Sequence, residues 1–225
     1  MTASITRPAR AALLSLCTLL PFADAPAQGV LGGRVYFGAT EQPLACIGVA
    51  LVSASDSLIS RTRTRADGTF DLLGPASPGL YRLSFVGMGL EVIDTDTLRL
   101  DATTEFDLPF RLALTRSRGT LTSARRDQLG IELEPSPLRG GASLRYPPEL
   151  LADSIEGRVI VGYAIDTVGR VDPRTTVVLE SSHPAFTASV RTTLGALRYQ
   201  PAQYSGAPQC IFSTQEFVFS LQGRR

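Results

Sequence analysis

The stretch EGRVIVGYAIDTVGRVDPRTTVVLES, residues 156–181, predicts two β-strands joined by a turn. Apolar residues alternate with other residues over residues 156–166 and again over residues 171–181, which is the period of a strand with one buried face. Gly169 lies in the turn between them, and its freedom to adopt a positive φ favours a tight reversal of the chain. We therefore expect an antiparallel hairpin at the centre of the C-terminal third.

A helix and a closing strand are predicted after this hairpin. Apolar residues recur at helical spacing from Pro184, and proline suits the first turn of a helix. The helical apolar residues are Phe186, Val190, Leu194 and Leu197. The period returns to two over residues 209–221, with Ile211, Phe217, Phe219 and Leu221 on one face. One helix packed on one face of a three-stranded antiparallel sheet would bury these residues together, so we expect an α+β domain over residues 144–225.

The same region resembles the C-terminal domain of TonB-type energy transducers. The shared segments, in chain order, are RYPPELL, IEGRVIVGYAIDTVGRVDPRTTVVLESS, HPAF, LRYQPAQYSGAP and FVFSL. In that family, the last strand of the domain lies at the sheet edge and pairs with a short extended segment of an outer-membrane receptor. The resemblance therefore implies a periplasmic binding domain with a link to transmembrane transport.

Residues 209–221 are the expected binding strand by their position in that family. An edge strand offers unpaired backbone N–H and C=O groups, so β-strand addition gives affinity with modest demands on sequence. The candidate partner-binding residues are Tyr199, Gln200, Pro201, Ser213, Gln215, Phe217 and Phe219. For Phe217 and Phe219 the alternative is burial in the core, and Ser213 and Gln215 are contacts only if their face is open.

Residues 28–112 have the pattern of an all-β sandwich, because short strands and turns follow one another at a spacing of about ten residues. The segments GRVYFGATEQPLACIGVALV and RTRADGTFDLLGPASPGLYRLSFVGMG resemble the carboxypeptidase regulatory-like, transthyretin-like family. That resemblance implies an accessory module without catalysis. Residues 113–143 form the expected linker to the C-terminal domain.

The N-terminal residues 1–27 read as a cleaved signal peptide. Arg7 and Arg10 precede an apolar run, and Ala25-Pro26-Ala27 fits a small-x-small cleavage site. We therefore expect an exported protein of the periplasm or cell envelope. The alternatives are an uncleaved inner-membrane anchor and lipidation at Cys17.

Cys46 and Cys210 remain after such cleavage and fall in different predicted domains. In an oxidising compartment they are candidates for a disulfide, which would pin the two domains together. Two buried free thiols are the alternative, because sequence spacing does not define connectivity.

No catalytic, cofactor or metal site is predicted. The single His183 precedes Pro184 and suits the start of a helix, where Ser181 and Ser182 are the expected caps. Asp166 and Asp172 flank a hairpin turn, in which aspartate is common. The formal net charge of +1 without a basic stripe disfavours nucleic acid as a partner.

The sequence thus predicts a non-enzymatic, TonB-like periplasmic protein that binds an outer-membrane receptor or another envelope protein by β-strand addition. One alternative is an envelope scaffold without energy coupling, since a cleaved chain with a short linker lacks a mechanical tie to the inner membrane. The other is an accessory module of a secreted peptidase or glycan enzyme, which only the N-terminal region favours.

Overall fold

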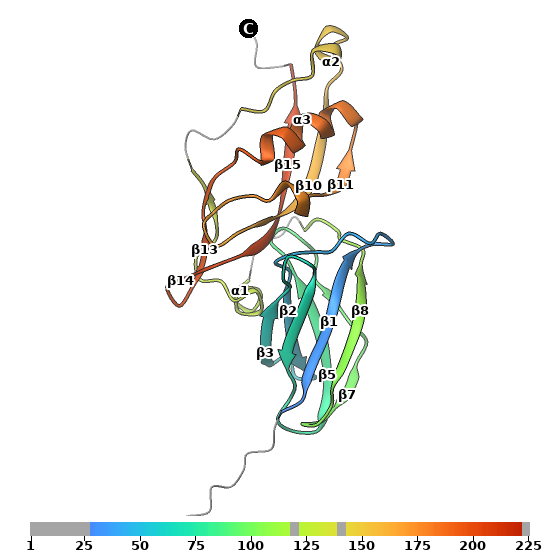
Figure 1. Ribbon diagram of the computed structural model, residues 1–225, viewed down its shortest axis with the longest axis vertical. Helices are drawn as coiled ribbons and strands as arrows, with labels where there is room; N and C mark the ends of the chain where they lie inside the picture. The colour runs from blue at the N-terminus through green and yellow to red at the C-terminus, as the bar shows by residue number, and fades with distance from the viewer. Residues whose placement is uncertain (1–27, 118–121, 139–142, 222–225) are drawn as a thin grey trace, which may run out of the picture.

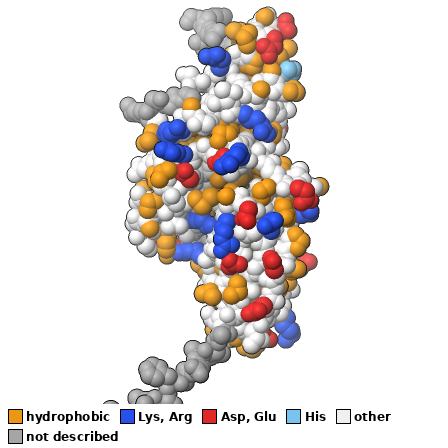
Figure 2. Space-filling model, viewed as in Figure 1, with side chains coloured by type: hydrophobic (Ala, Val, Ile, Leu, Met, Phe, Trp, Pro, Cys, Tyr) orange, Lys and Arg blue, Asp and Glu red, His pale blue; other side chains and the backbone are white. Residues whose placement is uncertain are grey.

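The computed structural model describes residues 28–117, 122–138 and 143–221, so the predicted signal peptide lies outside the described residues. The chain is mostly β-structure with few helices. Figure 1 shows two parts stacked along the long axis of the molecule, with the N-terminal strands in one half and the C-terminal sheet in the other. Figure 2 shows acidic and basic side chains interspersed over the visible face, without a large patch of one sign.

Two sheets form the N-terminal part. One sheet has the order β4-β1-β8, and β1 pairs antiparallel with β4 and parallel with β8. The other has the order β3-β2-β5-β6, with β7 also paired to β5. The strands are β1 (Val30–Phe37), β2 (Gly48–Ser53), β3 (Leu58–Arg63), β4 (Thr69–Leu73), β5 (Gly79–Val86), β6 (Ile93–Asp94), β7 (Leu98–Leu100) and β8 (Phe106–Leu112).

Large apolar side chains from both sheets form one core. Val35 and Phe70 come from the first sheet, and Leu51 and Leu83 come from the second. Gly68 closes the turn before β4 with a φ of +80°, where an L side chain would be strained. Apolar residues alternate along each strand, so one face of each strand is buried in this core, which gives the expected all-β character of this region.

The C-terminal part contains the predicted helix on a three-stranded antiparallel sheet, which confirms the α+β expectation for this region. The sheet has the order β11-β10-β15, with β10 in the centre. Its elements are α2 (Pro148–Ala152), β10 (Gly157–Ile165), the 3₁₀ turn η1 (Pro173–Thr175), β11 (Val177–Ser181), α3 (Pro184–Leu194), β12 (Tyr199–Gln200), β13 (Ala202–Tyr204), β14 (Ala207–Gln209) and β15 (Ile211–Phe219).

Helix α3 buries its apolar face on the sheet. Phe186 is buried and stacks on Phe219 of β15 with ring centroids 4.1 Å apart. The helix start differs from the expectation in one respect: His183 Nδ1, and neither serine, accepts the hydrogen bond from the Ala185 N–H at 3.1 Å. Ser182 instead accepts a hydrogen bond from the backbone N–H of Arg158 across the sheet at 2.9 Å.

The joining region contains two short elements, α1 (Ser123–Leu129) and β9 (Ser136–Pro137). Leu129 and Ile131 are buried in the core of the C-terminal part, while α1 also contacts β2 and β3. Strand β9 pairs antiparallel with β12. The described residues of the expected linker therefore pack against both parts.

The face of the C-terminal sheet opposite α3 contacts the N-terminal part. Phe212 and Val177 are fully buried there in a cluster with the N-terminal core. A disulfide joins Cys46 to Cys210, and their Cα atoms are 5.6 Å apart. The two halves of the chain thus share apolar contacts and a covalent link.

Candidate binding edge

Strand β15 is an edge strand of the C-terminal sheet, because β10 lies on one side of it and no named strand lies on the other among the described residues. Backbone groups of successive residues point to opposite sides of an antiparallel strand. In β15, the backbone N–H groups of Phe212 and Thr214 and the carbonyl of Phe212 point away from β10. By the same parity, Val218 also directs its backbone N–H and C=O outward.

The start of this edge is covered by the N-terminal part. The Phe212 N–H donates to the Cys46 carbonyl at 3.0 Å, and the Met88 N–H donates to the Phe212 carbonyl at 2.8 Å. The Thr214 N–H donates in turn to the Met88 carbonyl at 3.0 Å. The backbone of residues 212–214 is therefore paired on both sides, although β15 is an edge strand by topology.

The far end of the edge is more open. Val218 is opposite Arg158 in the register with β10, and the Arg158 backbone pairs with Ser182, on the side away from β15. This is the non-hydrogen-bonded arrangement, which leaves the Val218 backbone facing outward. The Val218 side chain is 60% exposed. The N–H and C=O groups of Val218 thus face away from β10 at the end of β15.

Tyr199 and Gln215 are brought together beside the sheet. The Tyr199 hydroxyl donates to Gln215 Oε1 at 3.0 Å, and the Tyr163 hydroxyl donates to the same oxygen at 2.5 Å. Burial raises the pKa of both tyrosine hydroxyls, so each remains a neutral donor. This network satisfies the Gln215 carbonyl internally and fixes Tyr199 as a packing residue.

The other candidates are dispersed. Gln200 is exposed and paired with Ser136, and Pro201 is half-buried beside it. Ser213 is half-buried and forms an isolated parallel bridge with Met88. Phe217 and Phe219 are buried in the core beneath α3, as the alternative interpretation of these residues held. By the parity described above, their backbone N–H and C=O groups point toward β10, so neither residue offers its backbone or its aromatic ring to a partner at the edge.

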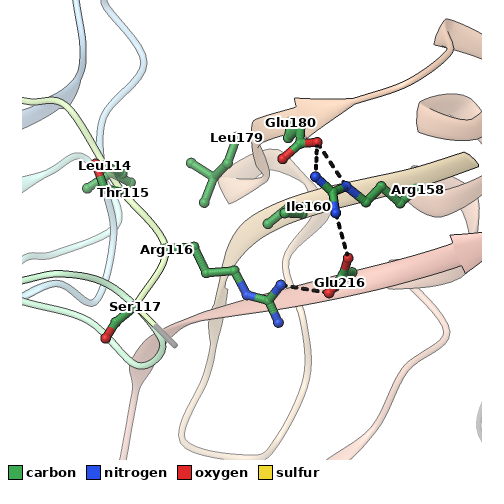
Figure 3. Close-up of a pocket in the computed structure, with 9 residues that line it drawn as sticks. All are labelled: Leu114, Thr115, Arg116, Ser117, Arg158, Ile160, Leu179, Glu180 and Glu216. Atoms are coloured by element: carbon green, nitrogen blue, oxygen red, sulfur yellow. Dashed lines mark hydrogen bonds and ion pairs between the residues drawn. The ribbon is translucent and has the colours of Figure 1, made fainter. Parts of the chain in front are cut away.

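A hollow of about 610 Å³ lies beside this edge, on the sheet face turned toward the N-terminal part. Figure 3 shows Arg116 reaching across it to Glu216, with Arg158 and Glu180 beyond. Arg116 Nη1 is 2.7 Å from Glu216 Oε2, and Arg158 Nη2 is 2.7 Å from Glu180 Oε1. Leu114, Ile160 and Leu179 supply its apolar lining. The two acids and two arginines balance each other, so the hollow has no net charge that selects an ion.

Sequence reasoning missed the residues that cover the edge, namely Met88 and Gly89. The available signal was the Gly-Met-Gly triplet, which gives a backbone able to approach another strand closely. Gly89 has a φ of +70°, and a Cβ on it would lie 2.3 Å from Thr214 Oγ1. Thr214 and Met88, which this pairing joins, are 126 residues apart in sequence. Local periodicity does not reveal a contact over that distance.

In residues 28–117, 122–138 and 143–221, no three His, Cys, Asp or Glu residues lie close enough together to hold a metal ion. Within the same ranges, no helix has the length and apolar character needed to cross a membrane.

This geometry defines a class of small α+β domain, in which a helix backs a three-stranded sheet and the last strand lies at the sheet edge. The family model described as Gram-negative bacterial TonB protein C-terminal matches residues 142–221. The resemblance inferred from the sequence is confirmed for this region. The N-terminal β region lies outside that match.

The chain is also similar to solved structures. The solution NMR structure of the Pseudomonas aeruginosa TonB C-terminal domain is 33% identical, with 41% of this chain and 91% of that chain covered and a TM-score of 0.35. A DUF3823 family protein from Parabacteroides merdae is 16% identical, with 88% of this chain and 100% of that chain covered and a TM-score of 0.29. No curated protein matches the chain.

Proposed function

We propose that this protein is a non-catalytic binding protein of the bacterial envelope that receives an extended segment of a partner on the edge of β15. The observation that carries the proposal is the outward-facing backbone of Val218. This residue lies on an edge strand within the region that matches the TonB C-terminal family model. Backbone pairing gives affinity without a fixed partner sequence, and it uses no catalytic group.

The partner class that the family match supports is an outer-membrane receptor or another envelope protein. In this proposal the chain is exported by residues 1–27, residues 28–112 form a carboxypeptidase regulatory-like sandwich, residues 113–143 join the parts, and residues 144–225 bind. An oxidising compartment is also where a disulfide such as Cys46–Cys210 persists.

Export predicts a shortened mature chain. If residues 1–27 are a signal peptide, mass spectrometry of the protein from the periplasmic fraction should give a mass that begins at Gln28. A mature chain that still begins at Met1 would contradict cleavage and restore the anchored transducer as the favoured function.

A second function, an envelope scaffold without energy coupling, is favoured by one specific observation. Cys46 and Met88 occupy the edge at residues 212–214, so in the part of the chain that the structure describes a partner strand is directed to the Val218 end. A short binding edge suits a static contact better than a contact that transmits force, since each backbone hydrogen bond contributes only about 0.5–1.5 kcal/mol.

The Val218→Pro substitution tests binding at the edge. Proline removes the outward N–H of Val218, and its side chain is already exposed, so we expect the folded structure to remain and peptide affinity to fall about tenfold. Synthetic peptides from the N-terminal segments of outer-membrane receptors would be titrated into the isotope-labelled full chain while amide shifts are followed. Val218→Thr is the matched control, because it retains the N–H and the β-branched shape.

Two results would contradict the proposal. One is a set of amide shifts that avoids β15 altogether. The other is equal peptide affinity for the wild type, Val218→Thr and Val218→Pro chains, because an added strand must lose a backbone contact when Val218 becomes proline.

A further inference from the structure

Residues 87–89 lie against β15 in the manner of a bound strand. Met88 forms a parallel bridge with Ser213 and exchanges two backbone hydrogen bonds with Phe212 and Thr214, at 2.8 and 3.0 Å. Thr214 Oγ1 lies 3.3 Å from the Met88 carbonyl oxygen and 3.1 Å from the Gly89 carbonyl oxygen, and its one proton can be donated to either. The N-terminal part therefore supplies, in cis, the same type of contact that an added strand would make in trans.

This segment is a short connection and not part of a sheet of its own. It follows β5 and precedes β6, and its other backbone contacts are few: the Ser117 N–H donates to the Gly89 carbonyl at 2.8 Å, and the Leu90 N–H donates to the Gly87 carbonyl at 3.3 Å. Strand β5 is held separately by β2 and β7. Residues 87–89 can therefore leave β15 without separating the N-terminal strands.

The two sides of the covered edge are held differently. The Phe212 N–H is bonded to Cys46, which the disulfide ties to Cys210 only two residues before Phe212. The Thr214 N–H is bonded to Met88, which has no covalent tie to β15. Loss of the Met88 contact would expose Thr214 and leave Phe212 covered.

We propose that residues 87–89 are an internal ligand of β15 that competes with a partner strand for the edge at residues 212–214. This inference rests on the proposed function, because it concerns the same edge. When the segment is bound, a partner is confined to the Val218 end; when it leaves, the added strand extends along β15 to Thr214. The apparent affinity of a partner for the longer edge is then reduced by the fraction of molecules in the closed state.

The Gly89→Ala substitution should weaken the internal ligand. Its Cβ would lie 2.3 Å from Thr214 Oγ1, so either the Thr214 hydroxyl must rotate or the segment must move, and both changes remove the contacts of this hydroxyl with the Met88 and Gly89 carbonyls. Gly206→Ala is the matched control, since its φ of +72° is close to the +70° of Gly89 and no atom lies within 4 Å of its added Cβ. Both variants carry the same backbone strain, and only one carries the clash with β15.

Amide hydrogen exchange of the full chain gives the first readout. In Gly89→Ala the Thr214 amide should exchange about tenfold faster than in the wild type, and the Phe212 amide should keep its protection. Gly206→Ala should leave both rates unchanged. Equal Thr214 exchange in the wild type and Gly89→Ala would overturn the proposal. If Gly89→Ala does not fold, Met88→Pro, which removes the N–H donated to Phe212, gives the same comparison.

Peptide binding gives the second readout. The probe is a synthetic peptide of residues 84–92, SFVGMGLEV, added to the full chain. It should bind Gly89→Ala about tenfold more tightly than the wild type or Gly206→Ala, with amide shifts at Thr214. Equal affinity for all three proteins would overturn the internal ligand.

The receptor peptides separate this inference from the proposed function. If they bind no variant while SFVGMGLEV binds Gly89→Ala, the internal ligand stands and the proposed partner class falls. If the receptor peptides bind the wild type and Gly89→Ala with equal affinity and equal shifts, the proposed function stands and the competition falls.

Discussion

Replacing Phe212 by alanine is expected to lower the free energy of unfolding by about 3–5 kcal/mol, the usual cost of removing a buried aromatic ring. Phe212 has 0% exposure and lies in the cluster formed with the N-terminal core. Its ring also fills the space above Gly162, where an added Cβ would come within 2.5 Å of Phe212 Cζ. Gly162 has no side chain that could fill that volume, so the substitution leaves a cavity between the two halves.

Chemical denaturation followed by circular dichroism would measure this loss. Because Phe212 contacts both halves, we also expect the unfolding of the N-terminal and C-terminal parts to occur together in the wild type. Val218→Ala on the same strand is the control, and its exposed side chain should change stability by less than about 1 kcal/mol. A loss below about 1 kcal/mol for Phe212→Ala would contradict the buried interface.

Removing the disulfide is the second large change. The double substitution Cys46→Ser and Cys210→Ser should destabilise the protein by about 2–4 kcal/mol, because the bond constrains the unfolded chain over a sequence separation of 164 residues. Long loops gain most from such a cross-link in the chain-entropy model. Cys46 is also buried beside Ala45 and Ala164, so the two introduced hydroxyls replace sulfur atoms in an apolar cluster.

Thermal unfolding with and without a dithiol reductant would measure the contribution of the bond. The wild-type midpoint should fall on reduction, while the double-serine variant should show the same midpoint in both conditions. An unchanged wild-type midpoint under full reduction would show that the cross-link does not contribute to stability. Thiol counting in the denatured protein confirms that reduction was complete.

Strands β10, β11 and β15 and most of helix α3 were predictable because their signals are local. Helix α3 ends at Leu194, before the expected Leu197, and the short strands β12, β13 and β14 were not predicted. The turn at Gly169 has a φ of +78°, and Asp166 Oδ1 accepts hydrogen bonds from the N–H groups of Val168 and Arg170 within it. The helical spacing from Pro184 and the alternation over residues 209–221 each follow from the period of one element. Such patterns depend on neighbours fewer than ten residues away, and these can be seen in the sequence.

The candidate binding edge was predictable only in part. Its strand and its place at the end of the sheet followed from the sequence and the family resemblance, and the alternative of core burial for Phe217 and Phe219 is what the structure shows. The covering of residues 212–214 was not predictable, because no feature of the sequence around Met88 indicates that its backbone pairs with Phe212 and Thr214. Main-chain pairing depends on backbone atoms that every residue carries.

Local sequence patterns were enough to predict β10, β11, β15, most of α3 and the turn at Gly169, since side-chain period and backbone freedom act over a few residues. The burial of Phe212 against the N-terminal core, the bond between Cys46 and Cys210, and the contact of Met88 with β15 are visible only in the folded chain. These contacts join segments more than a hundred residues apart, and they depend on how two folded surfaces fit together.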